Sequence, residues 1–95
     1  MQFSPELREG VASGRITLTY RLWTRPQVRE GGRYAVAGAH IEVDSIELLP
    51  FSTITAADVR RCGEKNREAL RSRTAHAGPV GDDTLVYRIE FHVVD

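Results

Sequence analysis

The segment that most constrains the fold is "TLVYRIEFHVV" (residues 84–94), in which apolar and polar side chains alternate with a period of two. Such alternation, with β-branched and aromatic residues, is typical of a half-buried β-strand. The apolar parity contains Leu85, Tyr87, Ile89, Phe91 and Val93, and the opposite parity contains Val86, Arg88, Glu90 and His92. We therefore predict a strand over 84–94 that packs the first set against a core.

A second alternating segment, "RITLTYRLW" (residues 15–23), follows the signals of a short helix. Ser4 and Pro5 are typical of a helix start and Gly14 of a left-handed helix end, so we predict a helix over 5–13. Beyond the glycine we predict a strand, with an apolar face of Ile16, Leu18, Tyr20 and Leu22. Its other face is polar and carries Thr17, Thr19, Arg21 and Trp23.

Two further strands are predicted in the middle of the chain. A loop with a proline and two adjacent glycines separates 15–23 from a short strand at 33–38, which precedes a longer strand at 40–50. The apolar parity changes within the longer strand, which predicts a bulge near Asp44 and Ser45. Bulges of this kind are common where a sheet curls.

Two helices are predicted after these strands. Thr55 as N-cap, Asp58 three residues later and Gly63 as a stop predict a helix over 55–63. The segment "NREALRSRT" predicts a second, very polar helix that buries Ala69 and Leu70, and "AHAGPVGDD" is predicted as a loop. Because strands and helices do not alternate regularly, a doubly wound parallel sheet is excluded. We predict a small α+β fold, an open curled sheet or barrel of about five strands with two or three short helices, in one domain over 1–95.

Composition limits the functions that this fold can serve. Thirteen basic residues balance thirteen acidic ones, so any nucleic-acid site must be local rather than a property of the whole surface. The single cysteine, Cys62, excludes an internal disulfide and is predicted as a small buried apolar residue. The three histidines show no metal-ligand spacing, so we predict no metal site and no cofactor. Without an apolar targeting segment, we expect a cytoplasmic protein and no membrane contact.

The order of these elements, with "SGRITLTYRLW", "IEVDSIELLPFSTITAADVRRCG" and "LVYRIEF", resembles the ASCH domain family over nearly the whole chain. The family signature is glycine, any residue, lysine, any two residues, glutamate, any residue, arginine. The residues at its four defined places are Gly14, Ile16, Thr19 and Arg21. The glycine and the arginine match, threonine is a known variant, and isoleucine replaces the lysine. The resemblance implies a PUA-like β-barrel of bacterial type that binds RNA, a nucleotide or a modified nucleoside.

The resemblance also raises the question of catalysis. In one branch of the family, similar enzymes deacetylate N4-acetylcytidine with a lysine, a threonine and a glutamate, whose places correspond to Ile16, Thr19 and the neighbourhood of Glu64. Because isoleucine cannot take a proton from a threonine hydroxyl, we expect no catalytic residue. An amidohydrolase or nuclease that uses Thr19 and Glu64 is the first alternative. A protein-interaction module with a vestigial cleft is the second, and the sequence leaves partners and oligomeric state open.

The polar face of 15–23 is the predicted binding surface. Arg21 is expected to recognise an anion or a base, with the hydroxyls of Thr17 and Thr19 as hydrogen-bond donors. Trp23 and Tyr34 are expected to offer stacking surfaces to a base. The predicted ligand-binding residues are Arg15, Thr17, Thr19, Arg21, Trp23 and Tyr34.

Overall fold

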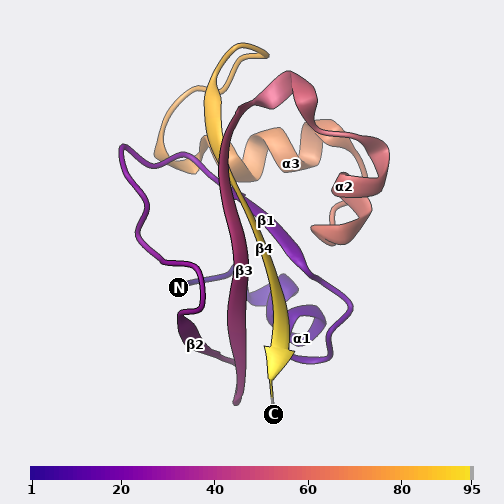
Figure 1. The fold of residues 1–95 in the computed structure, drawn as a ribbon. Helices are drawn as coiled ribbons and strands as arrows, with labels where there is room; N and C mark the ends of the chain where they lie inside the picture. The colour runs from indigo at the N-terminus through magenta and orange to yellow at the C-terminus, as the bar shows by residue number, and fades with distance from the viewer. Residues whose placement is uncertain (95) are drawn as a thin grey trace.

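The structure is a computed structural model that describes residues 1–94; Asp95, the last residue of the predicted domain, lies outside the described residues. Its centre is one antiparallel sheet with the strand order β1-β4-β3-β2 (Figure 1). The strands are β1 (Leu18–Arg21), β2 (Arg33–Val36), β3 (Ala39–Pro50) and β4 (Leu85–Val94). β1, β2 and β4 lie within segments for which the sequence predicted a strand, and β3 begins one residue before its predicted segment. The two long strands form the middle of the sheet.

The predicted bulge in the longer middle strand is confirmed. β3 pairs with β4 along its whole length, and the register shifts between Val43 and Ser45. The shift leaves the pairing on both sides intact, so this segment contributes one bent strand. Residues 1–94 contain four strands in an open sheet, one for each strand segment located in the sequence, whereas a total of about five was predicted.

The helices begin and end where local signals place them. They are α1 (Pro5–Ala12), α2 (Ala56–Arg61) and α3 (Arg67–Thr74), with single 3-10 turns at Phe51–Thr53 and Ala75–Ala77. Gly14 follows α1 with φ +85°. At the start of α2, the Thr55 hydroxyl accepts from the Asp58 N–H at 3.1 Å and the Asp58 carboxylate accepts from the Thr55 N–H at 3.1 Å. In this described part of the chain, no helix is long and apolar enough to cross a membrane.

The sheet buries side chains on both of its faces. On one face, Leu18, Tyr20 and Val86 pack with residues of α2, α3 and the turn after β3. On the other face, Ile89 and Phe91 pack beneath the N-terminal segment, α1 and the loop before β2. Figure 1 shows α2 and α3 near the end of the sheet where β3 stops, and α1 near the end where β4 stops. The helices that cover the two faces therefore lie over different ends of the long strands.

This arrangement corrects the prediction for β4. Leu85 was expected to face the core but is 51% exposed, whereas Val86, assigned to the opposite face, is fully buried. Beneath α2 and α3, an even-numbered residue of β4, Val86, is buried in the core. Farther along β4, the odd-numbered residues Ile89 and Phe91 are buried on the opposite face of the sheet. Simple alternation cannot show this change, because it depends on which helices cover each end.

Ile16 is buried in a slot between α1 and the turn after α2. A Cβ atom on Gly10 would lie 2.7 Å from the Ile16 Cδ1 atom, and one on Gly63 would lie 2.5 Å from it. Real Cβ atoms do not approach so closely, so both glycines make room for the isoleucine. The residue at the signature's lysine place is thus a packing residue in this chain.

Candidate functional site

A cavity of about 330 Å³ lies beside β1, between the N-terminal segment and α3. β1 and the residues after it supply Thr19, Arg21 and Trp23 to its wall, and the N-terminal segment supplies Phe3. Glu64 and Arg73 line the side formed by the helices. The cavity thus joins three parts of the chain that are far apart in sequence.

Three of the six predicted ligand-binding residues meet in this cavity. Thr19, Arg21 and Trp23 line it, as does Glu64, which belonged to the alternative catalytic interpretation. The other predicted residues do not line it and are Arg15, Thr17 and Tyr34. The sequence therefore located one wall of the cavity on β1, but it did not show which of the neighbouring residues lie outside the cavity.

The three excluded residues have other contacts. Arg15 is exposed and forms an ion pair with Glu9 at 3.1 Å. Thr17 precedes β1, and its hydroxyl accepts a hydrogen bond from Arg61 Nε at 3.1 Å. The hydroxyl of Tyr34 accepts from the backbone N–H of Arg29 at 3.2 Å, while its ring packs against the core on the far end of the sheet. The alternation within 15–23 did not reveal that Thr17 and Thr19 have different surroundings.

Arg21 is held in the cavity wall by two hydrogen bonds and two aromatic rings. Its Nε donates to the Thr19 hydroxyl at 3.1 Å, and its Nη2 donates to the Gln2 carbonyl at 2.6 Å. The guanidinium carbon lies 4.9 Å from the centre of the Phe3 ring and 6.0 Å from that of Trp23. Burial lowers the pKa of Arg21, yet arginine stays charged at neutral pH.

No carboxylate within residues 1–94 forms an ion pair with Arg21. A guanidinium has five N–H donors, and two of those on Arg21 have protein acceptors. No fully buried side-chain nitrogen or oxygen in the described chain lacks a partner, so Nη1 of Arg21, which has none, is not fully buried. The wall therefore presents a fixed positive charge with free donors.

The opposite wall carries a charge pair that is already satisfied. The side chain of Glu64 is only 5% exposed and accepts hydrogen bonds from Nε and Nη2 of Arg73. Arg73 also donates to Glu6 at 2.8 Å, which links α3 to α1. These hydrogen bonds, first of all the one to Glu64, raise the pKa of Arg73. Sequence reasoning missed Arg73 and Phe3, because no local pattern places α3 or the N-terminal segment beside β1.

Cys62 also lines the cavity but is not a reactive thiol. It is buried, as predicted, and burial together with the nearby charge of Glu64 raises the pKa of its thiol to about 12. The neutral thiol that results at physiological pH is a poor nucleophile.

A separate group of charges beneath α2 is structural. Arg88 donates to Glu90 at 2.6 Å, to Asp58 at 3.2 Å and to the Tyr20 hydroxyl at 3.2 Å. Glu90 also accepts from Arg61 at 2.9 Å, so two cations contact two partly buried anions, and the more exposed Glu47 lies 3.7 Å from Arg88. Burial, with the nearby charge of Asp58, raises the pKa of Tyr20 to about 12, and its hydroxyl stays protonated. This network, called the α2 network below, fixes α2 to β1 and β4.

Comparisons of the chain with protein-family models, with curated proteins and with solved structures found no match. The fold and the site therefore define the protein at the level of its class. Its described residues form a small α+β fold with an open, four-stranded antiparallel sheet and a cavity of mixed polar and apolar lining beside an edge strand.

Proposed function

We propose that this protein binds a nucleotide, a modified nucleoside or a short stretch of single-stranded RNA in the cavity beside β1. The observation that carries the proposal is Arg21, a charged group in the cavity wall with free donors and no carboxylate partner. Guanidinium groups suit the oxygens of phosphates and of base carbonyls, because their N–H groups form a planar fork. Arg21 is the residue that recognises such an oxygen.

The size and lining of the cavity agree with a ligand of this class. Its volume of about 330 Å³ lies near the lower end of small-molecule sites, roughly 300 to 1,000 Å³, and suits one nucleoside-sized group. The half-buried ring of Trp23 offers a stacking surface at the rim, which typically contributes about 1 to 3 kcal/mol per base. With no net charge on the chain, affinity must come from this local wall.

The proposal includes membership of the ASCH family, with its PUA-like fold, and a place in the bacterial cytoplasm. Support comes from Arg21, which matches the signature, and from Thr19, a variant at the signature's glutamate place; both line one cavity with Glu64. A helix on each side of an antiparallel sheet is compatible with an incompletely closed barrel.

A hydrolase that uses Thr19 and Glu64 is the second candidate, because both residues line the same cavity. Two contacts weaken it. The Glu64 carboxylate already accepts hydrogen bonds from Arg73, and the signature's lysine is replaced by the buried Ile16. Neither Glu64 nor Ile16 is therefore an obvious base for the Thr19 hydroxyl. Turnover of N4-acetylcytidine by the wild type, lost in Thr19→Ala, would establish this candidate instead. The cavity beside Arg21 also favours ligand binding over an interaction module with a vestigial cleft.

Trp23 is the only tryptophan, so its fluorescence provides a direct binding assay. We expect nucleoside monophosphates or short RNAs to change its emission saturably in the wild type. Arg21→Met keeps an unbranched chain between the two aromatic rings but removes the charge and should weaken binding by about 10- to 100-fold, the value of a charged hydrogen bond. Arg15→Ala, an exposed arginine outside the cavity, is the control and should bind like the wild type.

Three results would refute the proposal. One is a wild type that binds none of these ligands at millimolar concentration. Another is an Arg21→Met variant, folded by circular dichroism, that retains wild-type affinity. If both arginine variants lose affinity equally, binding depends on general surface charge and the cavity is not the site.

A further inference from the structure

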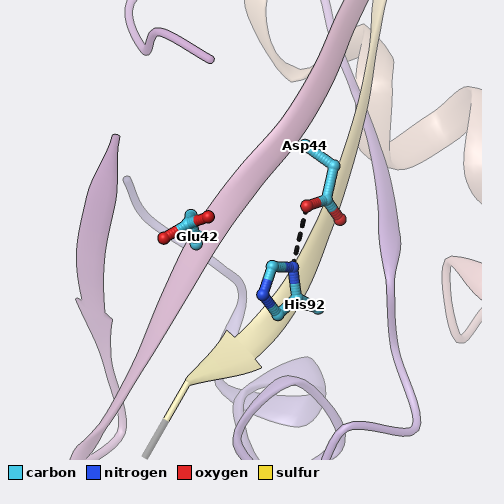
Figure 2. Close-up of side chains that lie close together, drawn as sticks. All are labelled: Glu42, Asp44 and His92. Atoms are coloured by element: carbon cyan, nitrogen blue, oxygen red, sulfur yellow. Dashed lines mark hydrogen bonds and ion pairs between the residues drawn. The ribbon is translucent and has the colours of Figure 1, made fainter. Parts of the chain in front are cut away.

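A second group of polar side chains lies on the β3–β4 ribbon, away from the cavity and the α2 network. Glu42 on β3 is the cross-strand partner of His92 on β4, and Asp44 lies beside the bulge. One nitrogen or oxygen atom from each of the three residues lies within 4.8 Å of the other two. Figure 2 shows these side chains gathered over the two strands.

The bulge leaves Asp44 without a cross-strand partner, and its side chain contacts the histidine. In an uninterrupted ladder the residue after Val43 would stand opposite Glu90, and two carboxylates would face each other. The register shift instead pairs Ser45 with Glu90 and leaves Asp44 out of the ladder. Its Oδ1 atom lies 2.8 Å from Nδ1 of His92.

The second carboxylate of the group, that of Glu42, is positioned by the neighbouring strand. Arg33 on β2 is the cross-strand partner of Glu42, and its Nε donates to Glu42 Oε1 at 2.9 Å. This contact orients the carboxylate, which has a second oxygen for another partner. His92 and Asp44 are 48% and 47% exposed, so an ion can reach them from solvent. With two carboxylates and one guanidinium, the local charge favours a cation.

We propose that Glu42, Asp44 and His92 bind one divalent transition-metal ion of the zinc class. One imidazole nitrogen with two carboxylate oxygens is a donor set that Zn²⁺ accepts, whereas Mg²⁺ and Ca²⁺ prefer oxygen alone. Metal–ligand bonds of about 2.0 to 2.2 Å place two donors roughly 3 to 3.5 Å apart. Small rotations of these exposed side chains reach that spacing, and water fills the remaining coordination positions.

The contact between Asp44 and His92 allows two arrangements that use the same three residues. The ion can take the place of the proton between Nδ1 and Asp44, so that both atoms become ligands. Alternatively, it binds Nε2 and Glu42 while Asp44 holds the other ring nitrogen, as outer-shell carboxylates do for many zinc-bound histidines. Loss of Asp44 weakens binding in either case.

The test is calorimetric titration of tag-free, chelator-treated protein with ZnCl₂. We expect one ion per chain, and His92→Gln and Asp44→Asn should each weaken binding by at least about tenfold. His40→Gln is the control, because His40 is an exposed histidine of β3 that does not belong to the group. This variant should bind Zn²⁺ like the wild type. MgCl₂ should give no comparable binding.

Three results would overturn the inference. The first is the absence of saturable one-to-one Zn²⁺ binding with a Kd below about 1 mM, since a weaker affinity would not indicate a specific site. The second is wild-type affinity in His92→Gln or in Asp44→Asn. The third is an equal loss in His40→Gln, which would mean that exposed histidines bind zinc without this geometry. Far-UV circular dichroism of each metal-free variant establishes that the fold is retained.

Discussion

Replacing Arg88 by methionine removes the cation at the centre of the α2 network. The Arg88 side chain is 16% exposed and that of Asp58 is 15% exposed, so this pair is largely withdrawn from water. Methionine keeps an unbranched apolar chain in the same space but donates no hydrogen bond. Asp58 then loses its only ion-pair partner among the described residues, whereas Glu90 keeps Arg61.

The size of the effect follows from how buried the two carboxylates are. Removing one partner of a fully buried pair costs about 3 to 5 kcal/mol, because the other charge is left without compensation. Water still reaches about a sixth of the Asp58 side chain and a third of Glu90, which reduces the cost. We expect the free energy of unfolding to fall by about 2 to 3 kcal/mol. For a chain of this size that corresponds to a melting temperature lower by roughly 10 to 20 °C.

Urea unfolding followed by circular dichroism measures this change, and two further variants test its cause. Arg61→Met removes a more exposed cation and should cost less than about 1 kcal/mol. The double variant Arg88→Met/Asp58→Asn should regain part of the lost stability, because it removes the uncompensated charge. The reasoning is wrong if Arg88→Met lies within about 0.5 kcal/mol of the wild type, the range of ordinary surface substitutions, or if the double variant regains nothing.

Two further predictions concern pH and packing. Hydrogen bonds from Arg88 and Arg61 lower the pKa of Glu90; for Asp58, burial alone would raise the pKa, but donors from Thr55 and Arg88 outweigh it and lower it. Carboxylates with lowered pKa values stabilise the fold above their ordinary values of 3.8 and 4.5, and that stability is lost as the pH falls through the folded-state pKa values. The melting temperature should therefore drop below about pH 4.5, and by less in Arg88→Met; equal drops in the two proteins would contradict this assignment. Gly63→Ala should lower the free energy of unfolding by about 1 to 3 kcal/mol more than Gly38→Ala in urea titrations, because both glycines have positive φ but only the first new Cβ meets Ile16. Equal losses would mean that backbone strain alone matters and that the slot around Ile16 yields.

Features with a local physical cause could be predicted from the sequence. The capping box at Thr55, the glycine stop after α1 and the bulge beside Asp44 each depend on a few neighbouring residues. The face of β4 that is buried could not be predicted in the same way. Val86 is buried only because α2 and α3 cover that end of the sheet, and these helices come from a different part of the chain.

The residues of the candidate sites show the same difference between local patterns and distant packing. Thr19 and Arg21 were found because they lie on one strand with a recognisable pattern. Phe3 and Arg73 complete the cavity from segments whose position is set by packing alone. His92 lies 48 residues from Asp44, so no spacing rule within a helix or strand could bring the proposed metal ligands together. Only the register of β3 on β4 does so.

Arg67 provides a comparison for the surroundings of Arg21. Within residues 1–94, Arg67 also has no carboxylate partner, and its ring contact is with Phe51. However, its donors reach the backbone carbonyls of Phe51 and Ile54, so it satisfies the turn that follows β3. Arg21 satisfies one backbone carbonyl and a hydroxyl on its own strand, and it lines a cavity. In the proposed function, an oxygen of the ligand accepts from Nη1 of Arg21, which has no acceptor among the described residues.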